Sequence, residues 1–375
     1  MREAVGEITK VARNDPALAA EGAVIFLERV SPALEQVDSS SGAIGSAVHH
    51  AIAALVPVIA QAPGDGATRD AWLERLWAAH VADEIPYIER LGEHWGDLCA
   101  SRDVASLWAD RLMEHTRRAL VPARPARVFF HGTSACLSAL LAGQRFDELV
   151  QLVATETYWP YTQWGVKALL AQGKKAEALR LAESCRSPWT TDRAADAMCE
   201  QILLSSGLAE EAYRRYGLRA HTAGSYTATF RAVTKQYPDR PALDVLADLV
   251  GTTPGLEGKW FAAAKEAGFL DLAITLARRS PVDPKTLARA ARDFAGTDAE
   301  FAIEAGMLAI NGFVSGLGFE VTGADVAMAY FGAMQAGTRL GRSADVRQRV
   351  AEVLRKEGVG AAFVGRALDG LVGGA

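Results

Sequence analysis

The sequence predicts an all-α protein whose larger part is an array of antiparallel helix pairs. Helix-start signals recur along the chain, alternating patterns of strand length are scarce, and a glycine followed by an alanine five residues later recurs at intervals typical of one helix pair. The 375 residues, 50% of them hydrophobic, exceed one compact core of usual size, so two domains or one extended repeat array are the natural options.

Helix starts are marked by a capping residue placed before a proline or at capping-box spacing. Asp15–Pro16, Ser31–Pro32 and Asp283–Pro284 each predict a capped helix whose first position is a proline. The missing N–H of proline costs nothing at that position, because the first N–H groups of a helix have no partner within the helix. Thr322 and Asp325 stand at the spacing of a capping box. These signals predict helices that begin at defined residues.

A glycine with an alanine five positions later is the feature that repeats. The pairs are Gly173 with Ala178, Gly207 with Ala212 and Gly268 with Ala273, and looser copies lie at Gly143, Gly296 and Gly341. We expect the glycine to end the first helix of a pair, where a left-handed backbone costs least. The small alanine then lets the second helix approach closely. Each pair leaves an apolar face uncovered, so neighbouring pairs are expected to stack on it.

The stretch WGVKALLAQGKKAEALRLAESC at 164–185 resembles a tetratricopeptide repeat. That family places an aromatic residue early in the first helix, a glycine at its end and an alanine five residues on, and Trp164, Gly173 and Ala178 match these positions. Trp260 precedes Gly268 and Ala273 in a similar arrangement. The resemblance covers roughly residues 130–357. It implies a right-handed superhelix of stacked helix pairs, an α-solenoid, with an interaction surface and no chemistry of its own.

The first 125 residues predict helices without the glycine spacing. They resemble segments that precede helical repeats in uncharacterised bacterial proteins. The segment VPARPARVFFHG interrupts the helical pattern with two prolines and two arginines, which predicts a boundary between an N-terminal helical region at 1–125 and the repeats at 126–375. Its last part, 126–132, is the best strand candidate in the chain, but we expect it to lead into the next helix.

Composition favours a cytoplasmic protein that is not a dedicated nucleic-acid binder. Lys and Arg number 40 and Asp and Glu number 45, so the net charge is −5. The N-terminal segment lacks the apolar stretch of a signal peptide, and the longest mostly apolar run, 51–60, is half of the roughly 20 residues that a membrane span needs. The four cysteines have neither metal-like spacing nor the density of a disulfide framework.

Residues 80–97 are the richest segment in side chains of the kinds that bind metals. His80 and Glu84 would share one helix face at i, i+4, and His94 and Asp97 would share another at i, i+3, so a metal site between two helices is conceivable. The alternative is an ordinary solvated helix face. The known His-Glu-x-x-His and Glu-x-x-His spacings are absent, so we expect no metal and no cofactor.

Two further motifs are better explained by structure than by chemistry. HGTSAC at 131–136 contains hydroxyl and thiol groups, but a nucleophile also needs a base and an orienting group brought together in space. We expect a helix start instead, with Thr133 or Ser134 as the cap and Cys136 in the core. The glycine-rich GFVSGLG at 312–318 lacks the Lys-Ser/Thr of a phosphate-binding loop and predicts an enlarged loop.

Two clusters are candidates for contact with a partner. The first contains four basic residues that could bind phosphates, although cations at a helix C-terminus followed by a solvated linker are the favoured explanation: Arg117, Arg118, Arg124 and Arg127. The second contains four aromatic residues within seven positions: Tyr158, Trp159, Tyr161 and Trp164. Large aromatic residues in helical repeats are mostly core, but any of these that lies outside the core is a candidate anchor for a partner.

These observations favour a non-catalytic scaffold or adaptor. We expect it to bind a protein or peptide on the concave face of the solenoid, with part of the aromatic cluster exposed there. Two alternatives remain from other classes of function. One is nucleic-acid binding by a basic face centred on the arginines at 111–127, and the other is a metal-dependent enzyme that uses the residues at 80–97.

Overall fold

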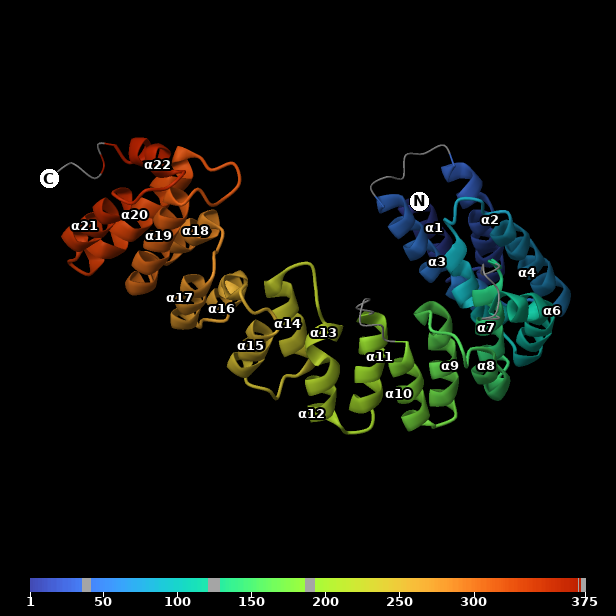
Figure 1. Cartoon of the computed structure of the whole chain (residues 1–375). Coiled ribbons are helices and arrows are strands. Elements are labelled where there is room, and N and C mark those ends of the chain that lie inside the picture. The colour runs from blue at the N-terminus through green and yellow to red at the C-terminus, as the bar shows by residue number, and fades with distance from the viewer. Residues whose placement is uncertain (36–41, 121–128, 186–192, 370, 372–375) are drawn as a thin grey trace. The chain divides into compact units, whose positions relative to one another are not determined.

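The computed structural model describes residues 1–35, 42–120, 129–185, 193–369 and 371 (Figure 1). Those residues form helices and connecting turns without a strand, which confirms the all-α prediction. The chain divides into two compact units, Met1–Ala212 and Tyr213–Ala375. The predicted boundary at 125–126 lies outside the described residues and stays a prediction. The helices on either side of it, α6 (Arg102–Leu120) and α7 (Thr133–Ala142), pack against each other within the first unit.

The first unit is built of helices, among which η1 is a 3-10 helix. The remaining elements are α1 (Arg2–Val11), α2 (Pro16–Leu34), α3 (Ala43–Gln61), α4 (Gly66–Val81), η1 (Glu89–His94), α5 (Trp95–Cys99), α8 (Phe146–Leu152), α9 (Trp159–Ala171), α10 (Lys175–Ser184), α11 (Arg193–Leu204) and α12 (Ala209–Ala212). One buried core runs from α2 to α9. Trp95 lies at its centre, with its ring edge-on to Trp108 at 5.0 Å.

The second unit begins with a π-helical turn, η2 (Tyr213–Gly217). Its other elements are α13 (Leu218–Ala220), α14 (Tyr226–Gln236), α15 (Ala242–Gly251), the 3-10 helix η3 (Glu257–Trp260), α16 (Phe261–Glu266), α17 (Leu270–Arg279), α18 (Pro284–Phe294), α19 (Ala299–Val314), α20 (Gly323–Arg339), α21 (Ser343–Leu354) and α22 (Ala361–Ala367). Helices α18, α19 and α20 pack tightly because small residues meet between them. A Cβ atom at Gly306 would lie 2.8 Å from the Ala329 carbonyl oxygen.

Most of the expected helix starts are confirmed, and one is wrong. Asp15 accepts a hydrogen bond from the Leu18 N–H, Asp283 caps α18, and Thr322 with Asp325 forms the capping box of α20. Ser31–Pro32 does not begin a helix, because α2 continues through Pro32 to Leu34. The Ser31 hydroxyl donates instead to the carboxylate of Asp83, far along the chain. A tertiary contact therefore replaces the expected cap.

The backbone has a positive φ at most of the glycines that define the expected turns. The φ angles are +76° at Gly173, +74° at Gly207 and +82° at Gly268, and the alanines five residues later are fully buried. Gly341 also has a positive φ, of +69°. Gly143 and Gly296 are exceptions: φ is −70° at Gly143, where the left-handed residue is Gln144, and Gly296 does not have a positive φ. Helices α9 and α10, which meet at Gly173, pack against each other. The tetratricopeptide-like superhelix itself stays a prediction.

Helix α3 is longer than the apolar run at 51–60 suggests. It extends over 19 residues, and among the described residues it is the one helix that is long and apolar enough to cross a membrane by length and composition. Its inner face, which includes Ile52, Leu55 and Ile59, is buried, and α3 packs against α2 in the core. A core helix of a soluble protein passes the same test of length and composition.

The remaining local expectations concern two loops. Residues 129–132 precede α7 without forming a strand, as expected, and residues 121–128 lie outside the described residues. The glycine-rich stretch at 312–318 ends α19 at Val314 and continues as the connection to α20, which confirms the enlarged loop. Gly316 and Gly318 in this loop have φ angles of +78° and +99°.

Candidate functional site

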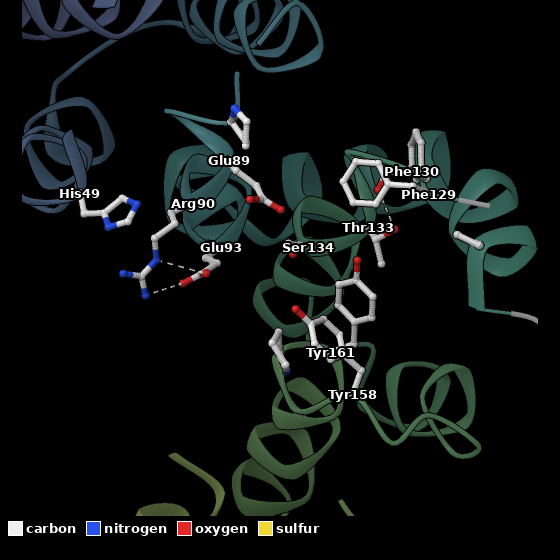
Figure 2. A pocket seen from close by; sticks show the side chains of 13 residues that line it. His49, Glu89, Arg90, Glu93, Phe129, Phe130, Thr133, Ser134, Tyr158 and Tyr161 are labelled. Atoms are coloured by element: carbon white, nitrogen blue, oxygen red, sulfur yellow. Dashed lines mark hydrogen bonds and ion pairs between the residues drawn. The ribbon is translucent and has the colours of Figure 1, made fainter. Parts of the chain in front are cut away.

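A cavity of about 490 Å³ opens in the first unit where α3, η1, α7 and α9 come together (Figure 2). One side carries charged residues of η1, and the other carries aromatic residues from the segment before α7 and from the start of α9. Six side chains define the chemistry of this cavity: Glu89, Arg90, Phe129, Phe130, Tyr158 and Tyr161.

The aromatic side of the cavity is fixed by the start of α9. The buried carboxylate of Glu156 accepts hydrogen bonds from the backbone N–H groups of Thr157 and Tyr158, both at 2.8 Å. The Tyr158 side chain, 53% exposed, stands edge-on to the half-buried ring of Tyr161, with 5.2 Å between ring centroids. Two aromatic rings at about a right angle therefore face the open space.

The loop before α7 adds a second pair of rings. Phe129 is 61% exposed, and its ring stands edge-on to His131 at 4.7 Å. Phe130 stacks on His115 of α6 at 5.3 Å. The hydroxyl of Thr133, at the start of α7, donates to the Phe130 carbonyl oxygen at 2.9 Å, which holds the loop against the helix. Phe129 therefore exposes an apolar ring beside the cavity.

The charged side of the cavity contains one ion pair and one separate carboxylate. Arg90 Nε lies 3.3 Å from Glu93 Oε1. Glu89 makes no ion pair or side-chain hydrogen bond with any residue that the structure describes. Burial and the charge of Arg90 lower the pKa of His49, and the charges of Glu93 and Glu89 partly oppose this shift. His49 is therefore mostly neutral at pH 7, and the described residues that line the cavity carry a net negative charge.

The position of η1 depends on the buried carboxylate of Asp83. Its Oδ1 atom accepts a hydrogen bond from the Ser31 hydroxyl at 2.5 Å and one from the Tyr87 N–H at 3.3 Å. Its Oδ2 atom accepts a hydrogen bond from the Ile88 N–H at 2.8 Å. Because Glu89 follows Ile88 directly, Asp83 ties the charged side of the cavity to α2.

The structure separates the four aromatic residues that the sequence places together. Tyr158 and Tyr161 line the cavity. Trp159 and Trp164 are buried, with 7% and 4% of their surfaces exposed. The ammonium group of Lys167 lies 4.1 Å from the centre of the Trp164 ring. The tyrosines are thus available to a partner, whereas the tryptophans belong to the core.

The candidate metal ligands do not come together. Helix α4 ends at Val81, so Glu84 is not on the helix face of His80, which is buried and donates from Nε2 to the His131 carbonyl oxygen at 3.2 Å. His94 Nδ1 and Asp97 Oδ2 lie 3.5 Å apart as a local pair. Among the described residues, no group of three His, Cys, Asp or Glu side chains could hold a metal ion.

The motif HGTSAC forms a helix start, although neither hydroxyl caps it. Gly132 is the N-cap residue of α7 and no side chain accepts a hydrogen bond there. Cys136 is in the core as expected, and burial raises the pKa of its thiol to about 11. Ser134 lines the cavity, but its hydroxyl makes no hydrogen bond to a side chain of the described residues. The base that an activated nucleophile needs is therefore not paired with it.

The arginines near the end of α6 are paired with carboxylates. Arg117 lies 3.2 Å from Glu148, and Arg118 lies 2.8 Å from Glu114. Arg124 and Arg127 lie outside the described residues. The two described arginines therefore share their charge with acidic neighbours, which weakens the case for a phosphate-binding face.

A second cavity, of about 340 Å³, lies in the second unit between α14, α15 and η3. Its lining is rich in hydroxyl groups, with the rings of Tyr226 and Trp260 edge-on at 4.7 Å. The hydroxyls are used locally: Thr252 donates to the Leu249 carbonyl oxygen at 2.6 Å, and Thr253 accepts from the Trp260 N–H at 2.8 Å. These contacts explain the residue types without a ligand.

Comparison with known proteins supplies no family. No protein-family model matches the chain, and no curated protein is significantly similar to it. The site is therefore argued from its own residues. Sequence reasoning missed Glu89, Arg90 and Phe129, because their position at a cavity depends on how η1 and the loop before α7 fold against α9. The available signal was the pair of phenylalanines directly before the HGTSAC motif.

Proposed function

We propose that the protein is a non-catalytic, cytoplasmic interaction protein that binds a protein or peptide partner at the cavity of the first unit. The observation that carries this proposal is the set of aromatic side chains held at the cavity with their surfaces exposed, above all Tyr158 and Phe129. Tyrosine and arginine dominate the energetics of protein interfaces, and both line this cavity. In this proposal, the helix pairs that resemble tetratricopeptide repeats are the scaffold.

The proposal places the partner at the cavity rather than along a concave superhelical face. Rings from two separate segments, Phe129 before α7 and Tyr158 at the start of α9, form one side of the cavity. Each segment is anchored by hydrogen bonds to the backbone. Segments whose backbone is held in this way lose less conformational entropy when a partner binds, which favours recognition by preformed contacts.

Site-specific photo-crosslinking tests this proposal in the intact protein. A p-benzoylphenylalanine is placed at Phe129, and in a control protein at Leu18, an equally exposed residue of α2 at 61%. We expect a crosslinked protein at position 129 in cells of the source organism, no such product at position 18, and loss of the product when Tyr158→Ala is added. The same products at both positions, or none at 129, would contradict the proposal.

A further inference from the structure

We infer that the cavity of the first unit accepts a basic side chain of the partner, a lysine or an arginine, between the Glu89 carboxylate and the rings of Tyr158 and Tyr161. This inference rests on the proposed function, because it specifies the chemistry of the partner at the same site. It is argued from the charges that line the cavity and from the arrangement of the rings.

Among the charged groups that the structure describes at the cavity, one carboxylate has no partner. Arg90 and Glu93 neutralise each other at 3.3 Å. The pKa of His49 is lowered by burial and by Arg90, so its imidazole adds little charge at pH 7. Glu89 forms no ion pair with a described residue. A single positive charge on a ligand would therefore complement the lining of this cavity.

Glu89 lines the same cavity as Tyr158, Tyr161 and His49. Burial is the main cause of the raised pKa of Tyr161, and the negative charge of Glu89 is among the groups that add to it. Glu89 also acts on His49, which lines the cavity from α3. Figure 2 shows the Glu89 carboxylate facing the cavity from η1, with Tyr161 and Tyr158 on the side of α9. The carboxylate and the rings thus face a common space.

The rings complete a site for a cation. The face of an aromatic ring attracts a positive charge, and a cation within about 6 Å of a ring centre gains from this attraction. Tyr158 and Tyr161 offer two rings at an interplanar angle of 81°. The exposed ring of Phe129 provides apolar surface that can cover the methylene groups of a lysine or arginine side chain.

An acidic or phosphorylated partner fits the cavity less well. Among the described residues that line it, the cation is Arg90, whose charge is already shared with Glu93 through Nε and Nη2. An anionic group would therefore find this positive charge partly neutralised. It would also meet the negative charge of Glu89. Lys167 does not line the cavity, and the charges of Glu93 and Asp97 act on it instead. Charge complementarity therefore favours a basic group over an acidic one.

Selection from a phage-displayed library of random 12-residue peptides tests the inference on the full-length protein. Peptides that bind at the cavity are identified by loss of binding to the Tyr158→Ala protein. We expect these peptides to contain a lysine or arginine whose replacement by norleucine weakens binding about tenfold, measured by fluorescence anisotropy at low salt. Glu89→Gln should weaken binding of the basic peptide by a similar factor and leave binding of the norleucine peptide unchanged.

A matched control variant and the pattern of peptide binding distinguish a failure of this inference from a failure of the proposed function. Glu84→Gln removes an exposed carboxylate that does not line the cavity, and should leave binding of every peptide unchanged. Peptides that depend on Tyr158 but not on a basic residue or on Glu89 would overturn the inference and leave the proposed function standing. If no selected peptide depends on Tyr158, both are wrong.

Discussion

Removal of the Asp83 carboxylate should destabilise the first unit strongly. Asp83 is 3% exposed and accepts three hydrogen bonds, from the Ser31 hydroxyl and from the Tyr87 and Ile88 N–H groups. Asp83→Ala would leave those donors buried without partners, at about 1–3 kcal/mol each. The hydrogen bond from the Tyr87 N–H is long, at 3.3 Å, so its loss should cost an amount near the low end of this range. The expected loss is about 4 kcal/mol, a large part of the stability of a domain.

Urea unfolding followed by tryptophan fluorescence measures this loss, because Trp72, Trp95 and Trp108 lie in the core of the first unit. Ser31→Ala is the matched control. It removes one donor and leaves the carboxylate with two N–H groups, so we expect a loss of about 1 kcal/mol. Asp97→Ala removes a carboxylate that is 69% exposed and should change stability by less than about 0.5 kcal/mol. An Asp83→Ala protein whose free energy of unfolding is within about 1 kcal/mol of the wild type would show that the three donors do not depend on this carboxylate.

Three further predictions concern stability and reactivity. Gly173→Ala should lower the free energy of unfolding in urea by about 1 kcal/mol, because alanine is strained at a φ of +76°. The cost should not be larger, because an added Cβ atom would have no atom within 4 Å. Gly6→Ala, in a helix with open space, should instead stabilise the protein by about 0.5 kcal/mol. Burial lowers the pKa of His80 below 6.5, so the unfolded chain binds a proton at a higher pH than the folded chain does. The free energy of unfolding should therefore fall as the pH drops below 6.5. A His80→Phe protein with the same pH dependence would argue against this. Burial raises the thiol pKa of Cys99 and Cys136 to about 12 and about 11, so iodoacetamide at pH 8 should modify them only in denaturant, as mass spectrometry would show.

The sequence predicts those features of the fold that depend on residues close together in the chain. The caps at Asp15 and Asp283 and the box of Thr322 with Asp325 are local, and the structure contains all three. Ser31, like Asp15, is a capping residue followed by a proline. Its hydroxyl instead donates to Asp83, which is 52 residues away in the sequence, and no local pattern predicts a contact between such distant residues. A local capping signal therefore fails where a tertiary contact uses the same side chain.

The candidate site likewise combines features that the local sequence predicts with features that depend on tertiary contacts. The aromatic cluster indicates a contact surface, but only the fold shows that Tyr158 is exposed and Trp159, next to it, is buried. Glu89 is one acidic residue among many in the sequence. It becomes a candidate ligand for a cation because Asp83 fixes the start of η1 and because Arg90 pairs with Glu93.

The most direct test of the central claim is a crystal structure of the full-length protein with a selected basic peptide. We expect the terminal nitrogen of the lysine or arginine to lie within about 4 Å of the Glu89 carboxylate and within about 6 Å of the ring centre of Tyr158 or Tyr161. A peptide whose basic side chain points into solvent, or one bound at the cavity beside Trp260, would contradict it.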